Sequence, residues 1–185
     1  GVATGVAAMG TFAYVAVFSG GLQVIDITNP ASPSVVGGLD TPGDAYGVAL
    51  MGNYAYIADW TSGLQVIDIT NPASPSIVEH MEMGYYAVGV AAGENHVYVV
   101  DSVVGLEVID ATNPASPLIV GSVGTPSEAV GIAVAGSHAY VAASGTGLQV
   151  IDITNPAAPS IIGSVDTGGV AYGVAVMGAL AYVAS

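Results

Sequence analysis

The chain has 185 residues, and its side-chain charge is acidic throughout: 14 Asp and Glu, no Lys or Arg, and a formal net charge of -14. Without cations it cannot neutralise phosphates, which excludes nucleic-acid binding and phosphoryl transfer that depends on Lys or Arg. The absence of Cys excludes disulfides, thiolate catalysis and Cys-ligated zinc. No apolar run of about 18 residues is free of Gly, Pro and charge, so we expect no direct membrane insertion of this segment.

Two sequence elements recur with a spacing of 42 residues. The first reads GVAAMGTFAYVA from Gly5 and returns from Gly47, Gly89, Gly131 and Gly173. The second reads GLQVIDITNPASP over 21–33 and returns, nearly unchanged, at 63–75, 105–117 and 147–159. Such a period predicts a single repeat array over 1–185, with units that start near 1, 43, 85, 127 and 169.

Each period predicts four short strands, because β-branched residues dominate the apolar runs and no helical period is present. In the second period we expect strands over 45–51, 54–58, 64–69 and 76–80. Gly52-Asn53 marks a tight turn between the first two. Asn71-Pro72 marks another, since Asn can accept a hydrogen bond from the backbone ahead of it and Pro presets φ.

Four antiparallel strands in about 42 residues match the length of a β-propeller blade, whereas the alternative, a β-solenoid coil, is usually shorter. We therefore predict an all-β protein of four-stranded propeller blades. Five first, five second, four third and four fourth strands make about four and a half blades. Because a closed ring needs whole blades, we expect a fragment of a longer array; two-chain closure and a helical assembly are the alternatives.

The Gly-Leu-x-Val-Ile-Asp core followed by Asn-Pro-Ala-Ser-Pro resembles the LVIVD repeat family over essentially the whole chain. The resemblance implies β-propeller repeats and an extracellular or cell-surface location on a bacterial or archaeal protein. It implies no catalytic motif. The chain departs from the family pattern at one strand position, where a second apolar residue is common but Gln23, Gln65, Glu107 and Gln149 stand here.

We expect structural roles for two of the polar residues that recur in the repeat. The aspartate of the third strand shares its face with apolar residues such as Leu22 and Val24. It should be partly buried and hydrogen-bonded by the next turn, which offers backbone N–H groups and the hydroxyl of Thr28 or Ser32. A tyrosine of the second strand should pack and make one hydroxyl hydrogen bond. The positions are Asp26, Asp68, Asp110 and Asp152, for which a functional ring is the alternative, and Tyr14, Tyr56, Tyr98, Tyr140 and Tyr182.

In a propeller the second-to-third and fourth-to-first loops open on one face, and half of the acids fall in these loops. We expect them either to stay solvated or to bind Ca²⁺, which takes six to eight oxygen ligands. No cofactor is required. The acids are Asp40, Asp44, Asp59, Glu82, Asp101, Glu128 and Asp166; the calcium candidates are Asp40, Asp44, Asp59, Asp101 and Asp166.

The segment 79–86, EHMEMGYY, departs most from the repeat. With Trp60 of the preceding loop it combines aromatic rings and carboxylates, which can stack and orient a sugar or peptide. The alternative is neutral drift in one loop of a duplicated array. The candidate ligand-binding residues are Trp60, His80, Glu82, Tyr85 and Tyr86.

His96 and His138 occupy equivalent positions in adjacent periods, and Glu94 lies beside the first. Two imidazoles and a carboxylate could hold Zn²⁺. Because other periods place Phe12, Tyr54 or Leu180 there, a partly apolar surface slot is the alternative. No nucleophile-elbow motif supports a Ser-His-Asp triad.

Near-identical repeats leave few unique residues for catalysis. We therefore expect a non-enzymatic extracellular or cell-surface scaffold or interaction module. Its partners would be proteins, or copies of itself joined through open blade edges, which lack the Lys residues that often blunt such edges. One alternative is a ligand-binding propeller for calcium-bridged carbohydrate or a basic peptide. A second is a hydrolase or lyase with a site completed outside this segment.

Overall fold

A computed structural model describes all residues of the chain, Gly1–Ser185, as 18 β-strands and one short 3-10 turn at Ser144–Thr146. By contacts the chain divides into two compact units. Unit 1 comprises residues 1–87 and 113–116, and unit 2 comprises residues 88–112 and 117–185.

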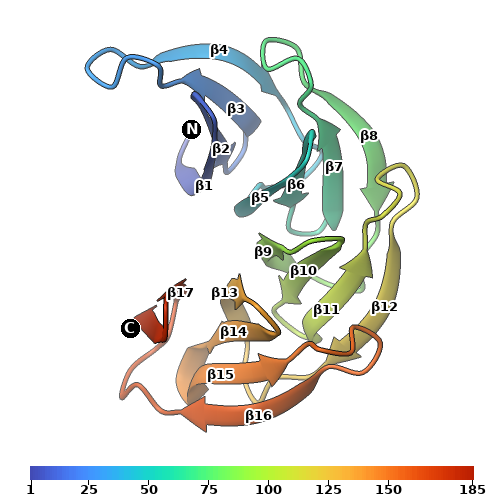
Figure 1. The fold of residues 1–185 in the computed structure, drawn as a ribbon, viewed down its shortest axis with the longest axis vertical. Coiled ribbons are helices and arrows are strands. Elements are labelled where there is room, and N and C mark those ends of the chain that lie inside the picture. Colours follow the sequence, from blue (N-terminus) through green and yellow to red (C-terminus); the bar gives the residue numbers. More distant parts are fainter. The chain divides into compact units, whose positions relative to one another are not determined.

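Unit 1 contains two complete blades, each a four-stranded antiparallel sheet whose strands follow sequence order (Figure 1). The first blade consists of β1 (Ala3–Met9), β2 (Phe12–Val17), β3 (Gly21–Asp26) and β4 (Ser34–Leu39). The second consists of β5 (Gly47–Met51), β6 (Tyr54–Ala58), β7 (Leu64–Asp68) and β8 (Ser76–Met81).

Unit 2 repeats the same sheet twice and then half of it. The third blade consists of β9 (Ala87–Ala92), β10 (His96–Asp101), β11 (Gly105–Asp110) and β12 (Leu118–Val123). The fourth consists of β13 (Ala129–Ala135), β14 (His138–Ala143), β15 (Gly147–Asp152) and β16 (Ser160–Val165). The last pair is β17 (Gly173–Met177) and β18 (Leu180–Ala184). The predicted propeller blades and strand count are therefore confirmed.

The predicted strand limits hold within two residues in the second blade. The first strand begins later than expected because its predicted start bonds elsewhere: the Ala45 amide donates to the Phe18 carbonyl (2.8 Å). Every complete blade carries a register shift at the same place between its third and fourth strands, as at Val24/Ile25 and Val66/Ile67. The repeated sequence thus reproduces local irregularities as well as strands.

Apolar residues of neighbouring strands form the core within each unit. In unit 1, Leu22 and Val24 of β3 pack with Ile57 and Ile67 of the next blade. Small residues are required where blades approach closely: a Cβ on Gly5 would lie 3.1 Å from the Tyr46 carbonyl oxygen. No helix of the structure has the length and apolarity needed to cross a membrane.

The repeated aspartates are partly exposed and bind the following turn, as predicted. Asp26 Oδ1 accepts a hydrogen bond from the Thr28 amide (2.8 Å), and the other three blades repeat this bond. Hydrogen bonds from the threonine lower the pKa of each of these aspartates. Each aspartate therefore stabilises a turn in its ionised form.

The repeated tyrosines pack as predicted in three blades, where Tyr14, Tyr56 and Tyr98 are buried; Tyr140 is partly buried and Tyr182 of the last strand is exposed. The expected hydroxyl hydrogen bond is wrong at Tyr56, whose buried hydroxyl has no partner. Burial, together with the nearby Tyr54, raises the pKa of Tyr56 to about 12. These tyrosines contribute chiefly through ring packing.

Candidate functional site

Four aromatic rings form a continuous row on the loops of unit 1. Trp60 stacks on Tyr86 with ring centroids 4.5 Å apart and on Tyr46 at 5.0 Å, and Phe18 meets Tyr46 edge to face at 5.4 Å. The rings come from the β2–β3 and β6–β7 loops and from the segments before β5 and β9. We call these four residues the aromatic row.

Backbone hydrogen bonds hold the central ring in place. The Trp60 amide donates to the Ala87 carbonyl (3.1 Å), and the Ala87 amide donates back to the Trp60 carbonyl (3.2 Å). Trp60 has φ 50°, and it is the one non-glycine residue with positive φ. A bulky residue is disfavoured there, by about 1–3 kcal/mol, and persists only when its surroundings hold it. The surrounding structure therefore holds the central ring of the aromatic row in a fixed position.

The repeat explains why the row is confined to unit 1. Trp60 shares its repeat position with Phe18, whereas the later periods have Ser102 and Ser144 there. Sequence reasoning identified Trp60 and Tyr86 but missed Phe18 and Tyr46. The signal that could have found Phe18 is its 42-residue offset from Trp60.

Stacking decides which ring surfaces remain available. Both faces of Trp60 are covered, by Tyr46 and by Tyr86. Tyr86 is 38% exposed and its neighbour Tyr85 is 53% exposed. The row therefore presents ring edges along its length and one further ring face at its Tyr86 end.

Asp59 lies directly before Trp60 and is completely buried. It accepts hydrogen bonds from Thr41 Oγ1 to Oδ1 (2.6 Å) and from the Gly43 amide to Oδ2 (2.9 Å). Burial raises the pKa of Asp59, and these two hydrogen bonds oppose the rise. The expectation of a solvated carboxylate is wrong here, since this acid belongs to the interior.

The other loop acids differ in exposure. Asp101 is as buried as Asp59, so it too departs from the solvated expectation. Asp44 is partly buried, and Asp40, Glu82, Glu128 and Asp166 are exposed. No group of three or more Asp, Glu or His lies close enough to share a metal ion. The five calcium candidates are thus not gathered into one cluster, and neither are His96, His138 and Glu94.

His80 forms a separate contact in unit 1. Its Nδ1 lies 3.0 Å from Nε2 of the buried Gln65, which also donates to the Ser62 carbonyl (2.7 Å). The imidazole is close enough to Asp59 to lower the pKa of that acid. Of the five predicted ligand-binding residues, the structure thus joins Trp60 and Tyr86 in one stack and places His80 in contact with Gln65. Glu82 and Tyr85 remain exposed.

Unit 2 contains a buried acidic pair that sequence reasoning missed in part. Asp101 Oδ1 accepts hydrogen bonds from the Val103 (2.7 Å) and Val104 (2.9 Å) amides, while Oδ2 has no partner. Glu107 is 7% exposed, and its Oε2 also has no partner. Burial and the nearby Asp101 raise the pKa of Glu107. The available signal was an acid at a position that is Gln in the other three complete repeats.

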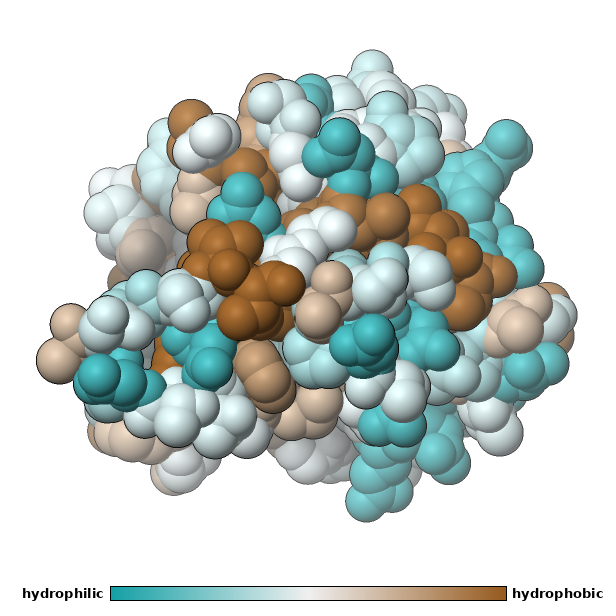
Figure 2. Space-filling view, turned by 90° about the horizontal axis from the view of Figure 1, so that it is seen from above, coloured by the Kyte–Doolittle hydropathy of each residue, from teal (hydrophilic) through white to brown (hydrophobic).

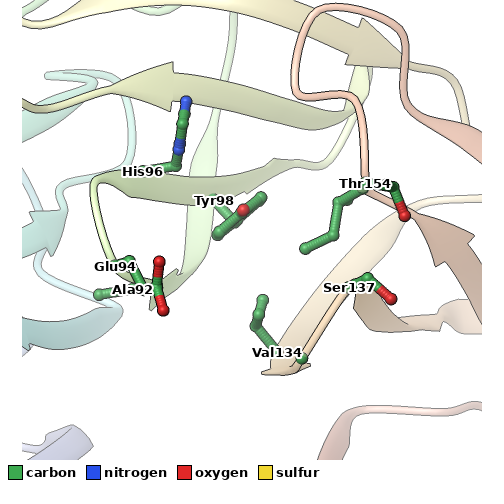
Figure 3. A pocket seen from close by; sticks show the side chains of 10 residues that line it. Ala92, Glu94, His96, Tyr98, Val134, Ser137 and Thr154 are labelled. Atoms are coloured by element: carbon green, nitrogen blue, oxygen red, sulfur yellow. The ribbon is translucent and has the colours of Figure 1, made fainter.

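Unit 2 also contains a pocket of about 520 Å³ beside the β9–β10 hairpin (Figure 3). Glu94, His96, Ser137 and Thr154 line it with polar groups, and Val134 is among its apolar residues. Three other periods carry a methionine at the position of Gly93, so this hairpin lacks a side chain that could fill the space: Met9, Met51 and Met177. The pocket is a second candidate site.

The sequence matches the family model described as the LVIVD repeat over residues 1–41, 42–82, 84–125 and 126–167. No curated protein matches the chain. Among solved structures, the computationally designed Ika8 protein is similar at a TM-score of 0.76 and 11% identity, over 96% of this chain and 54% of that chain.

Two further structures show the same likeness. A chain of a nidogen/laminin complex is similar at a TM-score of 0.72 and 12% identity, over 98% of this chain and 71% of that chain. The computationally designed Ika4 protein is similar at 0.65 and 11%, over 77% of this chain and 86% of that chain. This chain thus spans about half the length of the Ika8 chain, and at such identities the likeness concerns the fold alone.

Proposed function

The chain belongs to the LVIVD repeat family, and we propose that it is a non-enzymatic interaction module that binds basic protein segments through the loop face of unit 1. The observation that carries this proposal is the aromatic row together with acids that no cation of the chain neutralises.

We place the protein outside the cell or on its surface. The absence of Lys and Arg supports this location, because it removes every trypsin-type cleavage site.

The covered ring faces favour a peptide over a sugar. A sugar ring would stack on a free aromatic face. Both faces of Trp60 are occupied by neighbouring rings, so the row offers such a face only at its Tyr86 end. Ring edges and tyrosine hydroxyls suit the varied contacts of a peptide. The exposed tyrosines at the end of the row can also accept an Arg or Lys over a ring.

Charge adds selectivity to this face. The exposed acids Asp40 and Glu82 belong to the loops of unit 1, and the net charge of -14 attracts cationic partners from a distance. Attraction between exposed charges is screened beyond about 8 Å at physiological ionic strength. Binding should therefore weaken as salt is added, chiefly through slower association.

The test uses the single tryptophan as a probe. A peptide of alternating Arg and Gly is titrated into the protein and Trp60 fluorescence is recorded, with a Glu-Gly peptide and a panel of neutral oligosaccharides as comparisons. Tyr86→Ala should weaken Arg-Gly binding about tenfold, as expected when an aromatic contact worth about 1–2 kcal/mol is lost. Tyr172→Ala is the matched control, because Tyr172 is exposed but lies outside the row.

Saturable binding of an oligosaccharide, with no response to the Arg-Gly peptide, would replace this proposal by the carbohydrate alternative. Equal Arg-Gly affinity in the wild type and Tyr86→Ala would remove the aromatic row from the binding site.

A second candidate is self-association through uncovered strands. Hydrophobic side chains reach the surface in patches (Figure 2), and among the most exposed are Val2 and Val6 at one end of the chain and Met177 and Leu180 at the other. Sedimentation velocity over a range of concentrations tests it. Leu180→Glu should shift any assembly toward the single chain, and an assembly that this variant leaves unchanged would have another contact.

A further inference from the structure

Two carboxylates of unit 2 are buried on the same face of one blade. Glu107 of β11 pairs with Val99 of β10, and Asp101 lies two residues beyond Val99 on that strand. Side chains two residues apart on a strand point to the same side, so Asp101 is the diagonal neighbour of Glu107. Asp101 is fully buried and Glu107 is 7% exposed.

The other repeats show what normally occupies this place. Gln65 Nε2 donates to the Ser62 carbonyl at 2.7 Å, and Gln149 Nε2 donates to the Thr146 carbonyl at 3.2 Å. Val104 is the equivalent residue of the third blade. Glu107 thus brings an oxygen to the place where glutamine brings an N–H donor.

One oxygen of each carboxylate is left without a donor. Asp101 Oδ2 and Glu107 Oε2 are both buried and unpartnered. A buried, unpartnered carboxylate is strongly disfavoured, and the chain has no Lys or Arg that could neutralise either one. Asp59 shows the contrast, because Thr41 and Gly43 bind both of its oxygens.

We propose that Asp101, Glu107 and the Val104 carbonyl oxygen form a binding site for one divalent cation of calcium size. Hard cations take oxygen ligands, and the two unpartnered carboxylate oxygens supply them with negative charge. Two carboxylates and one carbonyl leave positions for water or further backbone oxygens. Mg²⁺ fits less well because it demands near-ideal octahedral geometry and gives up its water reluctantly. This site is independent of the aromatic row and of peptide binding.

The repeat supplies matched variants for the test. Glu107→Gln introduces the residue of the three other repeats and should fold. Gln149→Glu places a glutamate at the same strand position of the fourth blade, where Ala143 replaces the partner acid. Calcium chloride is titrated calorimetrically into each protein after chelator treatment. Thermal unfolding is measured in calcium and magnesium chloride at matched ionic strength.

The wild type should bind one Ca²⁺, and Ca²⁺ should raise its melting temperature more than Mg²⁺ does. Glu107→Gln should weaken the binding at least about tenfold and remove the difference between the two ions, whereas Gln149→Glu should add no second site. Calcium binding that is equal in the wild type and Glu107→Gln would overturn the proposal. The proposal would also be overturned if no ion bound to the wild type and Glu107→Gln were more stable than the wild type at neutral pH. Asp101 and Glu107 would then share a proton instead of a metal ion.

Discussion

Thr41 Oγ1 donates a 2.6 Å hydrogen bond to Asp59 Oδ1, and the two residues belong to consecutive blades of unit 1. Thr41 follows the last strand of the first blade, and Asp59 follows the second strand of the next. The Gly43 amide completes the arrangement at Asp59 Oδ2. The buried carboxylate of Asp59 thereby connects the first blade to the second through hydrogen bonds.

Thr41→Val should lower the free energy of unfolding by about 1–3 kcal/mol, because it removes a donor from a buried carboxylate. Thr167→Val is the matched control at the same repeat position. The Thr167 hydroxyl is buried without a partner, so its removal should be neutral or stabilising. Urea unfolding measures both, and equal losses would contradict a specific role for the Thr41–Asp59 bond.

Gly121→Ala should destabilise the fold by about 1–3 kcal/mol through overpacking. A Cβ at Gly121 would overlap the carbonyl oxygen of Pro156 in the next blade's turn. Gly163 occupies the same repeat position, and a Cβ there would lie 3.9 Å from its nearest neighbour. Gly163→Ala should therefore be tolerated in the same denaturation experiment. A similar loss in both variants would show that strand flexibility, and not the close approach, sets the requirement.

Asp68→Ala should lower the melting temperature by about 2–4 °C, the shift expected for loss of one turn-stabilising bond in a domain of this size. Asp40→Ala, which changes an exposed acid, should have little effect. Equal shifts in the two variants would remove the distinction between structural and surface acids.

Lowering the pH should remove the stabilising effect of the hydrogen bond between Asp68 and Thr70. Hydrogen bonds from Thr70 lower the pKa of Asp68, so its stabilising effect is present above the unfolded-state pKa and disappears as pH falls through the folded-state value. The stability difference between wild type and Asp68→Ala should be full at pH 5 and shrink as the pH falls below 4. Urea midpoints across this range measure it. A difference that stays constant with pH would mean that the ionised carboxylate is not the stabilising species.

Trp60→Ser should lower the free energy of unfolding by about 1–3 kcal/mol, since it removes two ring stacks but also relieves a left-handed backbone at a bulky residue. Serine is the residue found at this repeat position in two later periods. Tyr172→Ser removes an exposed ring outside the row and should change stability little. A stability gain in Trp60→Ser would show that backbone strain outweighs stacking at this position.

The repeat pattern in the sequence was sufficient to predict the blades. Its 42-residue period, alternating apolar residues and Asn-Pro turns are local signals, and local backbone preferences are enough to specify short strands joined by tight turns. The role of the repeated aspartates was predictable for the same reason. Donor and acceptor lie only two residues apart, as in Asp68 and Thr70.

Only the tertiary structure determined which loop residues are buried and which aromatic rings stack. Asp59 and Asp101 look like the solvated acids of the other loops, but both are buried, and Asp59 is bonded by Thr41 and Gly43, which folding brings close to it. The stack of Trp60 between Tyr46 and Tyr86 likewise depends on the juxtaposition of three loops. A repeat fixes which positions are equivalent, but burial, stacking and unpaired charge depend on which neighbours each copy meets, and those neighbours differ from blade to blade.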